Sequence, residues 1–116
     1  PIDQILDVLR EIKNIKEELT RIQADTNQSK SFANQSALDA GTKVFEQLLK
    51  LADLQERYGS VPFTEGDRTK LTDFFVQNYS LLSDSPLTSE VAQEIRKQLD
   101  SYDTIGELIA GLVSDL

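Results

Sequence analysis

The residues of this chain that could do chemistry are its carboxylates. Asp100, Asp103 and Glu107 follow one another at helical spacing, and Glu90 and Glu94 lie one helical turn apart. Grouped carboxylate oxygens are ligands that Mg²⁺ and Ca²⁺ prefer. The sequence holds no twelve-residue EF-hand loop, however, and Asp103 stands where a helix cap is expected. We therefore predict that these carboxylates form a solvated acidic face and bind no metal.

The inventory of side chains restricts enzyme chemistry. The chain has no His and no Cys, so the commonest general base and the thiolate nucleophile are both missing. It also lacks a Gly-x-Ser-x-Gly turn and a Gly-rich phosphate-binding loop. A helical hydrolase that holds Mg²⁺ between acidic motifs is one alternative, but the spacing of Glu17, Glu18, Glu46 and Asp53 is too loose to support it. The sequence predicts a protein that is not an enzyme and has no cofactor.

The sharpest pattern is a stripe of large aliphatic residues near the N-terminus. These residues alternate at intervals of three and four, which is the a and d spacing of a coiled coil or a helical bundle. They are Ile5, Val8, Ile12, Ile15, Leu19 and Ile22. Leu6 and Leu9 widen the stripe, which favours a three- or four-helix environment over a two-stranded coil. We predict self-association through this N-terminal seam, with packing inside a monomeric bundle as the alternative.

The C-terminal segment is apolar almost all round, and it is the second candidate for interaction. Its large apolar residues are Ile105, Leu108, Ile109, Leu112 and Val113. A short terminal helix buried in the bundle is the simpler interpretation. Because a bundle of this size covers one face of such a helix more easily than all of it, we expect the remainder to meet another subunit or a partner.

Breakers and caps divide the chain into helices. The first helix is expected over 2–22, and the polar stretch 26–35 is interpreted as a loop, with Ser36 starting the next helix. The alternative is that the first helix continues through 26–35 with a seam of small residues. A helix over 37–57 follows, and it ends at Gly59. Its apolar face is expected to contain Val44, Leu48, Leu51 and Leu54, widened by Phe45, Leu49 and Ala52.

Capping patterns place the remaining helices. Thr64 with Asp67, and Thr104 with Glu107, are capping boxes that open two helices, while Pro86 suits the first position of another that ends near 102. No stretch alternates like a strand. The sequence predicts an all-α, four- to five-helix bundle with a long N-terminal coiled-coil-like helix. It is expected to form one domain, 1–116, in which 1–25 is the oligomerisation or bundle helix and 36–116 the bundle body.

Charge restricts the partners. The net charge is −8, and residues 84–116 hold seven acids against only Arg96 and Lys97. Direct binding to nucleic acid is disfavoured because phosphate contacts need clustered Lys and Arg. No run of eighteen apolar residues predicts a membrane span, and the lack of Cys fits a cytoplasmic protein. We expect a structural or regulatory protein-interaction module that forms a homo-oligomer. The alternative is a small acidic adaptor or inhibitor that docks on a basic partner protein.

Overall fold

The computed structural model describes residues 1–25, 27, 29–83 and 85–115, and its regular elements are all α-helices. In chain order they are α1 (Ile2–Ala24), α2 (Lys30–Tyr58), α3 (Glu65–Ser83), α4 (Ser89–Asp100) and α5 (Ile105–Asp115). The all-α class and the five-helix count at the upper end of the expected range are confirmed.

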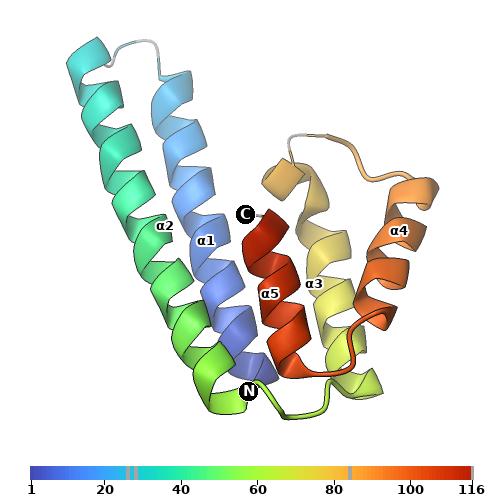
Figure 1. Ribbon diagram of the computed structural model, residues 1–116. Coiled ribbons are helices and arrows are strands. Elements are labelled where there is room, and N and C mark those ends of the chain that lie inside the picture. The colour runs from blue at the N-terminus through green and yellow to red at the C-terminus, as the bar shows by residue number, and fades with distance from the viewer. Residues whose placement is uncertain (26, 28, 84, 116) are drawn as a thin grey trace.

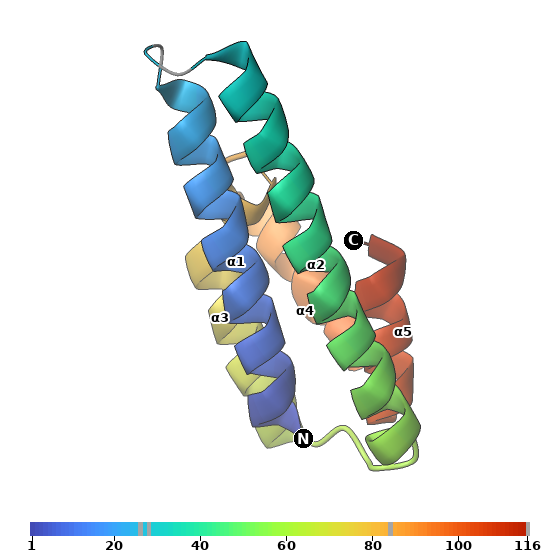
Figure 2. The same ribbon diagram turned by 90° about the vertical axis from the view of Figure 1, so that its left-hand side faces the viewer.

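The helices form two layers. α1 and α2 make an antiparallel hairpin, and α3, α4 and α5 lie behind it (Figures 1 and 2). α3 packs on α1, α5 packs on α2, and α4 packs on α3. The far end of the hairpin extends beyond the other three helices as an arm (Figure 1). This arm explains a radius of gyration of 15.6 Å, against about 13 Å expected for a compact domain of this length.

The core lies where the two layers meet. Its largest fully buried side chains come from four helices: Ile5, Leu51, Leu71, Ile105, Leu108 and Ile109. α4 contributes Leu99, which is 4% exposed. The inner face of α2 that the sequence predicted contacts this core through Leu51 and Leu54, with Leu48 partly buried beside them. Each such aliphatic side chain contributes roughly 1.5–3 kcal/mol by leaving water, so the core holds all five helices in one unit.

The start of α2 corrects one prediction. The loop between the first two helices is shorter than 26–35, because α2 begins at Lys30 and not at Ser36. Ser29 is its N-cap, and the Ser29 hydroxyl accepts a hydrogen bond from the Phe32 amide at 3.0 Å. The small residues Ala33 and Ala40 lie partly buried on the face of α2 toward α1. The small-residue seam considered as the alternative therefore exists, but it belongs to α2. Thr26 and Gln28, within the predicted loop, lie outside the described residues.

The capping box of α3 forms with both hydrogen bonds, and that of α5 forms only in part, because the Glu107 carboxylate accepts from the Asp103 amide instead of the Thr104 amide. At the start of α3, the Asp67 amide donates to the Thr64 hydroxyl at 3.2 Å and the Thr64 amide donates to the Asp67 carboxylate at 3.3 Å. At α5, the Glu107 amide donates to the Thr104 hydroxyl at 3.2 Å. Pro86 is not the first residue of α4, because that helix begins at Ser89 behind Thr88, whose hydroxyl caps it. Two residues, Leu87 and Thr88, therefore separate Pro86 from the first turn.

The connections between helices pair with each other. The α2–α3 and α4–α5 connections run antiparallel, with hydrogen bonds from the Phe63 amide to the Asp103 carbonyl at 2.9 Å and from the Ile105 amide to the Val61 carbonyl at 2.9 Å. Gly106 then donates to the Gly59 carbonyl at 3.1 Å. A Cβ on Gly106 would lie 2.8 Å from the Gly59 oxygen, so this close approach requires glycine. The pairing lays the first turn of α5 against the last turn of α2.

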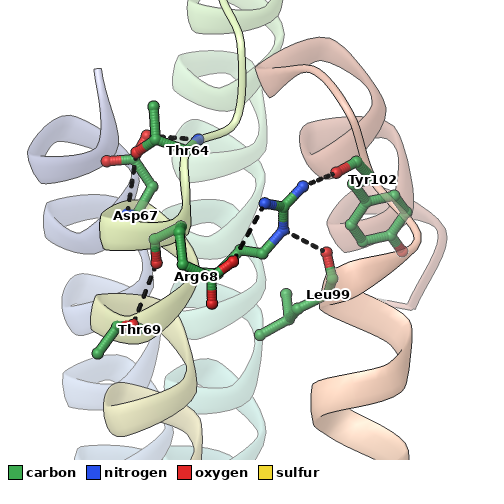
Figure 3. A network of polar contacts seen from close by, with 7 residues as sticks. Thr64, Asp67, Arg68, Thr69, Leu99 and Tyr102 are labelled. Carbon is green, nitrogen blue, oxygen red and sulfur yellow. Dashed lines mark hydrogen bonds and ion pairs between the residues drawn. The ribbon is translucent and has the colours of Figure 1, made fainter.

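Arg68 joins α3 to the end of α4. Its guanidinium donates to the Tyr102 carbonyl at 2.6 Å and to the Leu99 carbonyl at 3.4 Å, as Figure 3 shows. The same guanidinium lies 4.9 Å from the centre of the Phe63 ring. A cation at the carbonyl end of a helix is stabilised by the helix dipole, and a partly buried one is stabilised more than an exposed one. Arg68 therefore has a structural role between two helices.

Candidate interaction surface

Most of the predicted N-terminal seam is buried within the single chain. Ile5 is fully buried, and Val8, Ile12 and Ile15 are 4%, 7% and 8% exposed. The remaining two residues, Leu19 and Ile22, are half-buried. Exposure increases along the helix because α3 covers only its first part, whereas the arm has α2 alone as a neighbour (Figure 1). The internal-packing alternative therefore accounts for the first four residues, and the self-association of this chain stays a prediction.

The C-terminal segment is also largely covered by its own chain. Ile105, Leu108 and Ile109 have no exposed surface, and Leu112 packs, partly buried, against the core. Val113 is the exception, at 43% exposed. The layered arrangement covers more of α5 than the sequence suggested, because α5 packs on α2 while its other apolar side chains contribute to the shared core. Among the large apolar side chains of α5 between Ile105 and Asp115, Val113 is the one that still offers exposed surface to a partner.

The largest apolar side chains left in solvent lie on α2. Leu38 is 67% exposed, Phe45 is 60% exposed and Leu49 is 55% exposed. At about 100° per residue these three positions fall within about 40° of one another, so they form one row along the helix. The row lies about 140° around the helix from Leu51, the centre of the buried face. We call Leu38, Phe45 and Leu49 the outer ridge.

The sequence interpretation missed the outer ridge. It assigned Phe45 and Leu49 to a widened inner face, whereas both are exposed. The signal that could have separated them is the heptad spacing of Leu38, Phe45 and Ala52, with Leu49 between the last two. That spacing describes a second apolar stripe on the same helix. A helix with two apolar stripes can bury one in the core of its domain, and the other then stays exposed on the surface.

Acidic side chains border the outer ridge. Asp39, Glu46 and Asp53 form a row next to it at seven-residue spacing. Farther around α2 follows a parallel basic row, Lys43, Lys50 and Arg57. Asp53 pairs with Arg57 at 3.3 Å, while both partners stay more than half exposed. The acidic row is therefore the charge nearest the ridge on this side.

The basic row is itself enclosed by acids. Lys43 lines a cavity of about 170 Å³ with Glu18 of α1. Glu18 also accepts hydrogen bonds from Arg21, and these bonds together with the charge of Glu18 raise the pKa of the Arg21 guanidinium. Lys50 lines a wider groove together with Asp7 and Glu11. Acids of both α1 and α2 thus flank the lysines.

The other side of the ridge lies toward α5. There α2 presents Leu48 and Gln55, and the Gln55 amide donates to the Gly106 carbonyl of α5 at 3.1 Å. α5 holds two acids, Glu107 and Asp115, and no Lys or Arg. The acidic row of α2 is therefore the charge that borders the outer ridge directly, and it does so on one side.

The wider groove, of about 600 Å³, is lined by α1 and α2 and extends to the ridge, since Leu49 is one of its lining residues. It also contains Gln47, the buried polar residue of the core, which is 6% exposed. Within the described part of the chain no buried side-chain nitrogen or oxygen lacks a partner. The Gln47 amide makes no hydrogen bond to another described residue. Its nitrogen and oxygen are therefore not fully buried, and they contact solvent through the groove.

The carboxylates singled out in the sequence do not converge. Glu107 accepts a hydrogen bond from the Asp103 amide at 2.9 Å and so belongs to the cap of α5. Asp100, Glu90 and Glu94 are exposed on α4. Across residues 1–25, 27, 29–83 and 85–115, no group of three acidic side chains could hold a metal ion.

No family model, curated protein or solved structure matches this chain. In the described part of the chain, no helix is long and apolar enough to cross a membrane.

Proposed function

We propose that this chain is a non-enzymatic protein–protein interaction module that binds its partner through the outer ridge of α2. The observation that carries the proposal is the exposure of three large apolar side chains, Leu38, Phe45 and Leu49, in one row. Single exposed apolar residues are ordinary, but an apolar row with a polar rim is typical of a protein-binding surface.

The outer ridge is a better candidate than the N-terminal seam for a reason of energy. Ile5, Val8 and Ile12 are in the core, so an interface made from them requires α1 to leave the bundle. That would expose several side chains, at about 1.5–3 kcal/mol each, before any new contact forms. The outer ridge is available without such a rearrangement.

The size of the ridge predicts a modest affinity. Full burial of a Leu or Phe contributes roughly 1.5–3 kcal/mol, and more than half of each ridge side chain is exposed. The three together would contribute about 3–5 kcal/mol on this scale. Because association itself costs at least about 4 kcal/mol, a partner must also contact the rim of the ridge.

The test compares the wild type with a variant in which Leu38, Phe45 and Leu49 are replaced by Gln. The matched control is Phe32→Gln, which removes another exposed aromatic of α2, 48% exposed, that lies off the ridge. Immobilised proteins are incubated with lysate of the source cells, and retained proteins are quantified by mass spectrometry. We expect at least one protein to be retained by the wild type and the control and lost with the ridge variant. Equal retention by all three would contradict the proposal.

Light scattering at tens of micromolar decides whether a second copy is the partner. A dimer that the ridge variant abolishes would mean that the ridge binds itself. Alternatively, the dimer persists in the ridge variant and is lost when Leu19 and Ile22 are replaced by Gln. The interface would then be the half-buried end of the N-terminal seam.

A further inference from the structure

We infer that the outer ridge binds an amphipathic helix of a partner protein, with Lys or Arg along the edges of its apolar face. This inference rests on the proposed function and adds the chemistry of the partner.

The shape of the ridge suits a helix. Leu38 and Leu49 are eleven residues apart, which corresponds to about 16 Å or three helical turns along α2. α2 runs without a sharp kink from Lys30 to Tyr58, so it extends beyond the ridge at both ends (Figure 2). A helix that lies along it meets the ridge with side chains spaced three, four and seven residues apart, which is how a helix docks on an apolar face.

The acidic row disfavours an antiparallel pair of α2 helices from two copies of the chain. In an antiparallel pair of α2 helices the rows on the same side of the two ridges face each other, so Asp39, Glu46 and Asp53 would meet the same acids of the other copy. Each copy also carries a net charge of −8. A helix with basic residues at those positions meets opposite charges instead, and this is the complementarity that determines partner choice in paired helices.

The groove beside the ridge gives a basic side chain a place to bind. It extends to Leu49, and its lining includes the acids Asp7, Glu11 and Asp53, the bases Lys50 and Arg57, and the amide of Gln47. Gln47 has an acceptor oxygen that no described residue uses. A Lys or Arg from a helix on the ridge can extend over this groove, with its stem against Leu49 and its charged end near Glu11. Glu11, on the α1 side of this groove, and the acidic row of α2 thus offer carboxylates to the same basic side chain.

The experiment uses two synthetic helical peptides of eighteen residues with the same Leu positions. One carries Lys at every flanking position and the other carries Glu, and a Lys peptide of scrambled order controls for charge alone. Binding to the full chain is measured by calorimetry at low and physiological salt. We expect the Lys peptide to bind at least tenfold more tightly than both others, and its affinity to fall as salt rises.

Two variants show where the Lys peptide binds. Replacing the ridge residues Leu38, Phe45 and Leu49 by Gln should weaken binding tenfold or more, whereas Phe32→Gln should leave it unchanged. Neutralising the acidic row with Asp39→Asn and Glu46→Gln should weaken the Lys peptide about two- to fivefold per charge. Both neutralised residues are exposed, so the fold is expected to persist, and circular dichroism checks that it does.

The outcomes separate this inference from the proposed function. Equal binding of Lys and Glu peptides, or binding that ridge variants leave unchanged, overturns the inference. If no peptide binds but the wild type forms a dimer that the ridge variant abolishes, the inference is wrong and the proposed interaction module stands. If no peptide binds, the wild type is a monomer, and the lysate experiment retains nothing at the ridge, both fail.

Discussion

Replacing Ile5 by Ala tests whether the N-terminal stripe is core or interface. Ile5 lies in the second turn of α1 and has no exposed surface. Ala is a better helix former than Ile, so helix propensity does not oppose the change and the loss comes from packing. Truncating a buried Ile to Ala removes its burial and leaves a cavity, and we expect about 2–5 kcal/mol less stability.

The matched control is Leu38→Ala, because Leu38 is on the neighbouring helix and is 67% exposed. An exposed position away from special contacts should change stability by no more than about 0.5 kcal/mol. Urea unfolding, followed by circular dichroism at two protein concentrations tenfold apart, measures both variants. For a domain of this size the Ile5 variant should also melt about 10–20 °C lower, at roughly 4 °C per kcal/mol.

Two results would refute the assignment of Ile5 to the core. One is a loss of less than about 1 kcal/mol on Ile5→Ala, which would mean that the site is not tightly packed. The other is a wild-type midpoint that rises with protein concentration and loses that dependence in the variant. The second result would place the N-terminal stripe between subunits.

Three further predictions test the way the helices are joined. Gly106→Ala should destabilise the protein, because the new Cβ would lie 2.8 Å from the Gly59 oxygen. Gly41 has nothing within 4 Å of the position of a Cβ, so Gly41→Ala should stabilise the protein by about 0.5–1 kcal/mol. Thermal melts of the two variants check this, and equal effects would contradict it. Arg68→Met should lower the free energy of unfolding by about 1.5–3 kcal/mol, because two carbonyls lose a charged donor. Arg68→Lys should restore only part of this loss. A loss below about 0.5 kcal/mol for Arg68→Met in urea titrations would contradict the prediction. Truncation after Tyr102 should abolish cooperative unfolding, since it removes the fully buried Ile105, Leu108 and Ile109; a truncated chain that melts like the wild type would show that α5 is not part of the core.

Local sequence signals were sufficient for the helix class and for several helix ends. The 3–4 spacing of Ile5, Val8 and Ile12 identified a helix, and that helix is α1. Thr64 with Asp67 identified the start of α3, because a capping box involves only groups within one turn. Such features depend on neighbours in the chain, so the sequence determines them directly.

The start of α2 depended on packing between helices. Ser31 and Asn34 have weaker helix propensity than most of their neighbours, and this is one reason why the sequence suggested a loop there. In the structure the same stretch is helical, with Ala33 partly buried toward α1 and Ser29 as its cap. Contact with a neighbouring helix outweighs a propensity difference of a few tenths of a kcal/mol per residue.

The candidate site shows the same division. By itself the sequence determined that α1, α2 and α5 carry apolar faces. It did not determine which stripe of α2 would be buried, because periodicity reports that a face is apolar and not what covers it. The tertiary structure determines which stripe is buried. The Gly59–Gly106 contact lays α5 against α2, and α1 packs against another side of α2. Those two neighbours cover Leu51 and Leu54. Leu38, Phe45 and Leu49 lie on nearly the opposite face of α2, so they stay in solvent.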